Sequence, residues 1–526
     1  MERWRQRLGS SPWWRGAAAV GAGALPALAF PAPSLWWFAY VALVPWMLLA
    51  RSAATPRRAA LDGWLGGLGF MLAVHHWLLP SLHVFTVVIA ALLGALWAPW
   101  GRLLRRLLHG VPSAGQAAAA LVAVPSAWLM VELVRSWQGL GGPWGLLGSS
   151  QWQVVPALRL ASVGGVWLVS LLVVTVNTGI TVLVVARGAR VPAVAGLVAT
   201  VTVTGAAWAW APRPATDGRV RIAVVQPGVV AGADSVARRF DREEELTRRL
   251  AGQDVDLVVW GESSVGFDLA ERPDLAGRIA ALSREVGADV LVNVDARRPA
   301  GDGGSTARGI YKSSVLIGPD GPTGARYDKM RLVPFGEYVP ARGLLGWATS
   351  VGKAAGEDRM RGTRQVVMDV RHGGRDLRVG PLVCFESAFP DMTRKLTRDG
   401  ARVLLAQSST STFQHSWAPE QHASLAAVRA AETGRPMVHA TLTGVSAVYG
   451  PDGARAGAWL GASASAARVY EAPTAHGSTL YVRFGDWPVH AAVTVLVVLA
   501  AAEAVRWSRR RAAASGLPSA HVWHGR

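Results

Sequence analysis

A series of apolar segments, each close to the length that crosses a lipid bilayer, restricts the fold of this chain more than any other feature. A helix needs about 20 apolar residues to cross the hydrocarbon core. Seven segments near this length precede residue 212, and an eighth follows residue 487. Buried helices of a water-soluble protein are the alternative, but so many apolar runs in series would have no polar faces to show to water. We therefore predict a polytopic α-helical membrane domain of about eight spans, placed near residues 15–32, 35–50, 60–80, 83–100, 116–134, 159–186, 191–211 and 488–505.

Arginine residues predict how these spans are oriented. The formal net charge is +19, which on its own would suggest a nucleic-acid partner. The arginines, however, gather in clusters that precede the first span and follow the second, fourth, sixth and eighth. With eight spans, all clusters face one side, which the positive-inside rule identifies as the cytoplasm. We therefore expect a multi-pass protein of the cell membrane with both termini in the cytoplasm, and no binding of nucleic acid.

The chain between the seventh and the eighth span has a different composition. It has the mixed charge of a water-soluble domain, and short β-rich runs alternate there with amphipathic ones. Such alternation favours an α/β fold with helices packed on sheets. We predict three parts: an N-terminal membrane domain of about seven helices (1–212), an extracytoplasmic catalytic domain (213–486), and a C-terminal transmembrane helix with a basic cytoplasmic tail (487–526).

One cysteine, Cys384, occurs in 526 residues. A single cysteine makes neither an intramolecular disulfide nor a thiolate zinc site. Because free cysteine is among the most buried residue types, a position in the core is one interpretation. A nucleophile is the other, because Cys384 ends an apolar run in G-P-L-V-C-F-E-S. Reactive groups of open α/β sheets gather at such strand ends.

Two further segments end expected strands with reactive side chains. V-V-W-G-E-S-S carries Glu262, and Y-D-K-M-R-L-V-P-F-G-E-Y-V-P carries Lys329 and Glu337. Taken singly, a glutamate there is usually a solvated cap and a lysine is usually a surface charge. Together with Cys384 they supply a mechanism. Cysteine is nucleophilic as the thiolate, a carboxylate can accept its proton, and an ammonium group can stabilise the thiolate and the oxyanion of a tetrahedral intermediate.

The sequence frames around these residues resemble a known family. A Glu, then a Lys in K-x-x-L-V-P-F-G-E-x-V-P, then a Cys in C-F-E is similar to the triad of the nitrilase superfamily. The lysine segment resembles its membrane-bound branch, the bacterial apolipoprotein N-acyltransferases. The resemblance implies an αββα sandwich for the catalytic domain. It also implies that Glu262 is the general base, Lys329 stabilises the oxyanion and Cys384 is the nucleophile. Glu337 would hold the lysine, and Glu386 would support the site.

The resemblance also implies a reaction. An acyl chain of a phospholipid would form a thioester with the cysteine, and the N-terminal amine of diacylglyceryl-cysteine in an apolipoprotein would then receive it by ping-pong kinetics. Such chemistry needs no metal or redox cofactor. Two other functions stay open: a membrane-held nitrilase-like acyltransferase or amidase that acts on a different amine or amide, and a non-catalytic membrane scaffold. The first is motivated by positions where the family commonly has other residues, namely Ser409, Thr410, Thr412 and Leu442.

Apolar residues directly after the lysine frame are candidates for lipid access. This access segment, defined as Leu344, Leu345 and Trp347, lies within P-A-R-G-L-L-G-W-A-T-S. A loop packed on its own domain is one interpretation, and a mobile arm whose apolar tip enters the membrane surface and admits lipid is the other. Near the outer end of the fifth span, Glu132 and Arg135 lie three residues apart, so they can pair on one helix face.

Overall fold

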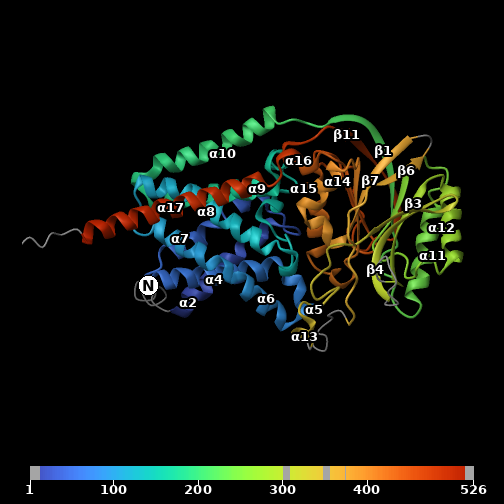
Figure 1. The fold of residues 1–526 in the computed structure, drawn as a ribbon, viewed down its shortest axis with the longest axis horizontal. Coiled ribbons are helices and arrows are strands. Elements are labelled where there is room, and N and C mark those ends of the chain that lie inside the picture. Colours follow the sequence, from blue (N-terminus) through green and yellow to red (C-terminus); the bar gives the residue numbers. More distant parts are fainter. Residues whose placement is uncertain (1–11, 300–307, 347–355, 373–374, 516–526) are drawn as a thin grey trace, which may run out of the picture.

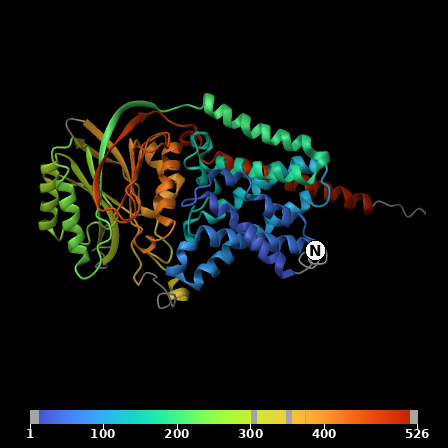
Figure 2. The same ribbon diagram turned by 180° about the vertical axis from the view of Figure 1, so that it is seen from behind.

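The computed structural model describes residues 12–299, 308–346, 356–372 and 375–515. A bundle of helices forms one half of the molecule, and layers of strands and helices form the other half (Figures 1 and 2). The start of α2 (Pro12–Ala24) and the end of α17 (Trp487–Ser515) both lie at the end of the bundle that is remote from the strands. The two ends of the described chain therefore lie on the same side of the molecule.

The helical half has helices at every position where a span is predicted. Among the described residues, five helices are long and apolar enough to cross a membrane: Val84–Leu108, Ala114–Arg135, Val155–Val185, Arg190–Trp210 and Trp487–Arg509. Length and composition thus support a multi-pass membrane protein. In Figure 1 these helices are α6 (Val84–Gly94) continued by α7 (Ala98–Leu108), then α8 (Ala114–Arg135), α9 (Val155–Val185), α10 (Arg190–Trp210) and α17.

The other three predicted spans are not single long helices. The third forms α4 (Pro56–Val74), which continues after a bend of 64° in the short helices of His76–Leu82. The second forms the shorter apolar helix Trp36–Arg51, and for the first span α2 has only 13 residues. A count of eight spans is therefore not confirmed. Within the described ranges, five helices meet the length and composition of a span, or six if the bent pair is one span.

The bend after α4 brings the chain toward the strands. His75 ends α4, and the short helix α5 (Leu79–Leu82) follows the bend. His83 then has a φ of 48°, which lies in the left-handed region and turns the chain into α6. Trp77, inside the bend, contacts Phe413 of the other half, and their ring centroids are 4.8 Å apart. The bend therefore places a membrane-side tryptophan against the strand-containing half.

Two β-sheets form the middle of the other half. The strand order is β11-β1-β2-β3-β4-β5 in the six-stranded sheet and β10-β9-β8-β7-β6 in the five-stranded sheet. Neighbours β1, β2 and β3 are parallel, as are β7, β8 and β9. The strands are β1 (Ala215–Gln226), β2 (Leu257–Trp260), β3 (Asp289–Pro299), β4 (Arg308–Gly318), β5 (Gly321–Asp328), β6 (Met368–His372), β7 (Arg375–Val383), β8 (Val403–Ser408), β9 (Met437–Thr441), β10 (Ala447–Tyr449) and β11 (Ala466–His476).

The layers follow from apolar side chains on both faces of each sheet. Because side chains alternate along a strand, one set meets between the sheets, where Val224 and Leu405 belong to one core. The other set faces helices on the outside. The αββα arrangement predicted for this half is confirmed. The covering helices are α11 (Ser235–Arg248) and α12 (Pro273–Val286) on the six-stranded sheet, and α14 (Pro390–Arg398) and α15 (Ala418–Thr433) on the five-stranded sheet.

The inner helical layer joins the two halves. One apolar cluster contains both Trp128 of α8 and Ala426 of α15. Helix α9 is interrupted at Gly165, whose φ of 68° and ψ of −175° break the helical hydrogen bonds. Glu432, at the end of α15, accepts a hydrogen bond of 2.7 Å from the Val166 N–H at this break. The kink therefore lets a carboxylate of the catalytic half bind the backbone of a membrane helix.

Candidate active site

Ends of three strands from both sheets meet at one edge of the sandwich. Glu262 follows β2, Lys329 follows β5 and Cys384 follows β7. The side-chain amide of Gln407, on β8, donates to the Trp260 carbonyl of the opposite sheet at 2.9 Å. Because carboxyl ends of parallel strands lie at the same edge of a sheet, residues that are distant in the sequence converge here.

The turn that carries Cys384 is strained and held by a carboxylate. Cys384 has a φ of 50° between β7 and the 3₁₀ helix η9 (Cys384–Ala388), a backbone conformation that costs about 1–3 kcal/mol for a residue with a side chain. The buried Glu386 carboxylate accepts four hydrogen bonds. Their donors are the N–H groups of Val383 (2.8 Å), Met330 (2.7 Å) and Arg331 (3.0 Å) and the hydroxyl of Tyr327 (2.7 Å). Glu386 thus joins the turn of the cysteine to the segment that starts at Lys329.

Lys329 lies inside the site as an ammonium group. Its side chain is 1% exposed, and its Nζ lies 2.7 Å from Glu337 Oε1 and 3.4 Å from Glu262 Oε1. Burial alone would lower the pKa of Lys329, but the charges of Glu337 and Glu262 hold that pKa above its usual value. Glu337 is itself oriented because its Oε2 accepts a hydrogen bond from Val333 N–H at 2.8 Å. Lys329 therefore supplies a fixed positive charge at the site.

The carboxyl of Glu262 and the thiol of Cys384 lie close enough for each group to shift the pKa of the other. Burial would raise the pKa of Glu262, yet the nearby ammonium groups of Lys312 and Lys329 lower that pKa to about 2. Burial and the Glu262 charge raise the pKa of Cys384 to about 12, although Lys329 and the N–H of Ser409 act in the opposite direction. At neutral pH the pair therefore rests as a carboxylate beside a protonated thiol, which is the state from which a base removes a proton.

A second lysine in the site, Lys312, is absent from the residues expected from the motifs. Its Nζ lies 3.0 Å from Glu262 Oε1, and it donates to Ser263 Oγ at 2.9 Å. In the pairing of β3 with β4, Lys312 stands opposite Asp295. A charged residue inside the apolar strand β4 is the only hint in the sequence, and the hint becomes informative only when the partner strand is known.

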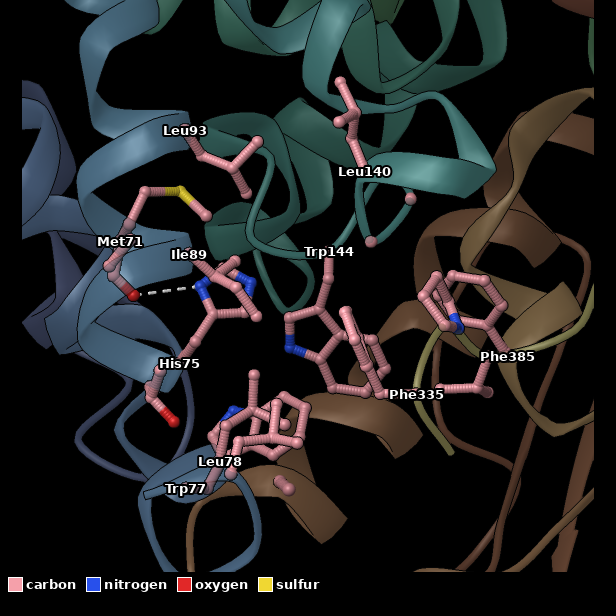
Figure 3. A pocket seen from close by; sticks show the side chains of 18 of the residues that line it. Met71, His75, Trp77, Leu78, Ile89, Leu93, Leu140, Trp144, Phe335 and Phe385 are labelled. Carbon is pink, nitrogen blue, oxygen red and sulfur yellow. Dashed lines mark hydrogen bonds between the residues drawn. The ribbon is translucent and has the colours of Figure 1, made fainter. Parts of the chain in front are cut away.

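An apolar cavity leads from Cys384 into the helical half (Figure 3). Its volume is about 410 Å³. The bent segment after α4 contributes Trp77 and Leu78, helix α6 contributes Ile89 and Leu93, and Phe385 closes the end beside the cysteine. Such a lining fits hydrocarbon chains and excludes water. Further lining residues labelled in Figure 3 are Met71, His75, Leu140, Trp144 and Phe335.

Two charged residues of α8 hold one wall of this cavity. The Arg135 guanidinium donates to the carbonyl groups of Trp144 and Gly145, both at 2.6 Å. The Glu132 carboxylate accepts from Leu147 N–H at 2.7 Å. The expected pairing of Glu132 with Arg135 is therefore not their main contact, because each charge binds the backbone of the loop that follows α8. This loop orients Trp144 toward the catalytic half.

One glutamine of the catalytic half binds both cavity tryptophans. The Gln421 side-chain oxygen accepts from the indole N–H groups of Trp144 (2.9 Å) and Trp77 (3.2 Å). The two indole rings lie 5.3 Å apart between centroids. The next residue, His422, hydrogen-bonds to Ser387 Oγ at 2.9 Å, and burial lowers the pKa of His422 to about 4, so its ring is neutral at pH 7. Within the described ranges, no three potential ligand side chains gather as a metal site.

Comparison with known proteins gives matches over nearly the whole chain. A family model described as "Apolipoprotein N-acyltransferase N-terminal domain" matches residues 22–179, and one described as "Carbon-nitrogen hydrolase" matches residues 221–464. The apolipoprotein N-acyltransferase of Geobacter metallireducens is 29% identical and covers 92% of this chain and 94% of its own length. That of Pseudomonas syringae pv. tomato is 28% identical, with 93% of this chain and 96% of the relative covered. This chain belongs to the apolipoprotein N-acyltransferase family.

Solved structures also show similarity to about half of this apolipoprotein N-acyltransferase family member. An amidase from Nesterenkonia sp. AN1, of the nitrilase superfamily, is 20% identical and covers 53% of this chain and 98% of its own, with a TM-score of 0.35. The NitFhit protein of C. elegans is 21% identical and covers 49% of this chain and 62% of its own, with a TM-score of 0.37. Family membership makes the protein an acyltransferase enzyme of the membrane.

Two of the four residues that motivated a different specificity line the cavity. Ser409 and Thr410 line the cavity, and Leu442 is buried. Thr412, in contrast, is exposed. The first two are held by the next loop, since Thr410 N–H donates to Thr443 O at 2.8 Å. Ser409 and Thr410 therefore form part of the polar surface beside the sulfur.

The access segment lies only partly within the described residues. Leu344 and Leu345 belong to the short helix α13 (Arg342–Leu345), but their side chains and the whole of Trp347 lie outside the described part of the chain. In Figures 1 and 2, α13 lies beside α5, where the two halves of the molecule meet. The lipid-access role of this segment stays a prediction.

Proposed function

We propose that this protein transfers an acyl chain from a phospholipid, through a thioester on Cys384, to the N-terminal amine of diacylglyceryl-cysteine in an apolipoprotein. One observation carries the proposal. Cys384, Glu262 and Lys329 converge at the end of an apolar cavity whose opposite wall is built from membrane helices. A water-soluble amidase has no use for such a wall, whereas a lipid substrate needs one.

In the first half-reaction the ester carbonyl of the phospholipid lies against Cys384 and its acyl chain occupies the cavity. The sulfur attacks the carbonyl carbon while Glu262 takes the thiol proton. Because the pKa of the thiol lies far above that of the carboxyl, the proton leaves as the carbon–sulfur bond forms. Lys329 stabilises the oxyanion. The ester C–O bond then breaks, and Glu262 returns the proton to the oxygen of the departing lysophospholipid.

In the second half-reaction the neutral α-amine of the acceptor attacks the thioester. Glu262 takes a proton from the attacking nitrogen, the carbon–sulfur bond breaks, and the sulfur regains a proton as thiol. The product is an amide, and the enzyme returns to its starting state. Because one product leaves before the second substrate reacts, the kinetics are ping-pong. Glu337 and Glu386 position the lysine and the cysteine turn in both steps.

The arrangement in the membrane follows from the same proposal. Residues 1–212 form the membrane domain and hold the lipid, residues 213–486 form the extracytoplasmic catalytic domain, and residues 487–526 form the last span with a cytoplasmic tail. The arginine clusters support this orientation. Reaction of a membrane-impermeant thiol reagent with single cysteines, introduced by Ser508→Cys and Gln253→Cys into the Cys384→Ala protein of sealed cells, tests it. Labelling of the cysteine at 508 from outside contradicts the orientation.

Trapping of the thioester tests the chemistry. The full chain in detergent is incubated with a phospholipid that carries an alkyne-labelled acyl chain, and the peptide that contains Cys384 is analysed by mass spectrometry. We expect an acyl adduct that neutral hydroxylamine removes, and no adduct in Cys384→Ala. Added diacylated lipopeptide with a free amine should take over the label, whereas the N-acetylated lipopeptide should not.

Each alternative function predicts a different result in the trapping assay or in a complementation experiment. Transfer to other amines but not to the lipopeptide identifies an acyltransferase of other specificity. Full complementation of a strain that lacks the wild-type gene by Cys384→Ala identifies a scaffold. Absence of any adduct on wild-type Cys384 overturns the proposal.

A further inference from the structure

Lys312 is a charged residue of the site for which the proposed reaction has no role. It projects from the middle of β4, and its side chain is 12% exposed. Its ammonium group lies 3.0 Å from Glu262 Oε1, closer than the 3.4 Å that separates Lys329 from the same oxygen. The carboxylate that the reaction uses as a base therefore has two cations on one oxygen, and the nearer one is Lys312.

The neighbours of Lys312 keep it in this position. Its Nζ donates to Ser263 Oγ at 2.9 Å and lies 3.5 Å from Asp295 Oδ2. Ser263 and Asp295 line an open, polar groove, whereas Cys384 lines the apolar cavity. The lining residues described for the groove and for the cavity do not overlap. Lys312 thus connects Glu262 to a water-facing side of the site that is separate from the lipid side.

Charged and titratable groups surround Glu262 on seven segments. The region contains more carboxylates than Glu262 alone, so the effect of Lys312 has to be judged against all of them. Facing groups are Asp295 on β3, Lys312 on β4, Lys329 and Glu337 after β5, Arg359 near Asp295, Cys384 in η9 and His422 on α15, while Arg239 of α11 donates to the Ser263 carbonyl at 2.7 Å.

We propose that Lys312 is a positioning residue for the general base: its ammonium group fixes the Glu262 carboxylate toward the thiol and keeps it ionised whenever the cavity excludes water. A carboxylate behind a lipid substrate loses its contact with solvent, and an isolated buried charge is unstable. Lys312 supplies the compensating charge from the side of Ser263 and Asp295, which line the groove that the lipid does not fill. Lys329 is then free to stabilise the oxyanion while Glu262 stays charged.

This inference rests on the proposed function, in which Glu262 accepts the proton of Cys384 as the carbon–sulfur bond forms. A more weakly ionised Glu262 has to lose a proton before it can act, so its titration enters the pH profile of thioester formation. Removing an opposite charge at this distance raises a carboxyl pKa by about 1–3 units. Without Lys312 the rate of thioester formation should therefore fall at acidic pH, where the wild-type rate does not change with pH.

The test compares rates of labelled-acyl transfer onto Cys384 from pH 4 to pH 7 in full-length protein. Lys312→Met removes the charge, and Lys312→Arg keeps it. We expect wild type and Lys312→Arg to stay level toward pH 4, while Lys312→Met becomes up to about tenfold slower at pH 4 than at pH 7. The ratio of the two variants at each pH cancels the titration of shared groups such as His422.

Two controls keep the outcome decisive. Lys395→Met removes a lysine from an exposed pair with Asp399 and should not change the profile. Asp295→Asn removes an anion next to Lys312 and leaves the charge of Lys312 in place. The acid limb of the pH profile of this variant should therefore not move to higher pH. Lys312→Gln replaces Lys312→Met if the latter does not accumulate.

Two results distinguish failure of this inference from failure of the proposed function. An equal loss at every pH in Lys312→Met, or a level profile, overturns the role of Lys312 while thioester formation in the wild type still stands. No thioester in the wild type at any pH overturns the proposed function itself.

Discussion

Replacement of Glu386 by glutamine tests how the turn of the nucleophile is held. The Glu386 residue is 0% exposed, and all four of its hydrogen-bond partners are donors. Glutamine has one oxygen and one NH₂ group, so its NH₂ must face either the Val383 N–H or the three donors on the other side. The first arrangement breaks one hydrogen bond and the second breaks three. We therefore expect the glutamine to direct its NH₂ toward Val383, directly beside Cys384.

The size of the effect follows from the bond that is lost. A hydrogen bond to a charged group contributes about 1.5–3 kcal/mol. The lost bond is the one at the base of the strained turn, where Cys384 has a φ of 50°. Because each 1.36 kcal/mol changes a rate tenfold, a loss of this size in the positioning of the sulfur makes thioester formation about 10- to 150-fold slower.

The assay is the single-turnover rate of labelled-acyl transfer from phospholipid onto Cys384. Glu285→Gln is the matched control, because Glu285 lies on the surface of the same half with a side chain that is 47% exposed. Its rate should equal that of the wild type. A rate for Glu386→Gln within about twofold of the wild type, in protein that elutes as the wild type does in size-exclusion chromatography, refutes the reasoning that Glu386 holds the reactive turn.

Three further results are expected. Gln421→Leu removes the acceptor shared by the two cavity tryptophans, and each hydrogen bond contributes about 1 kcal/mol. Acyl loading should therefore fall several-fold, while alkylation of Cys384 by iodoacetamide stays unchanged. Slower alkylation contradicts a role confined to the lipid wall. Serine at all three positions of the access segment should lower acyl loading and leave folding intact, and normal loading removes that role. Glu262→Gln removes the charge that raises the thiol pKa, so alkylation at pH 8 should become faster while thioester formation is lost; parallel loss of both refutes the assigned electrostatics.

Sequence motifs identified much of what the structure brings together. Apolar segments of spanning length marked the membrane helices, short β-rich runs between amphipathic ones marked the α/β half, and the family resemblance implied its sandwich. Glu262, Lys329 and Cys384 each stand at the end of a strand, as the strand-end rule favours, but their roles were taken from the resemblance to the nitrilase superfamily. The number of spans was harder to obtain, because hydropathy does not distinguish one straight helix from the bent pair around His75.

Residues whose role depends on contacts outside their own element could not be predicted from the sequence. Gln421 and Trp77 are 344 positions apart, and no local sequence pattern links them. Lys312 acquires meaning only from the register that places it opposite Asp295. Arg135 was expected to pair along its own helix, but it binds the backbone of the following loop instead. In each case a single tertiary contact defines the environment of the side chain, and local pattern carries no record of that contact.

The apolar cluster that includes both Trp128 and Ala426 has a practical consequence for anyone who wishes to divide this enzyme. A fragment limited to the strands and their helices would leave the outer surface of α15 exposed to water. This surface is apolar because it packs against the helical bundle in the full chain. Such a fragment would aggregate when made alone. Because this cluster also joins the two halves, the proposed lipid substrates would have to move to Cys384 rather than Cys384 to them.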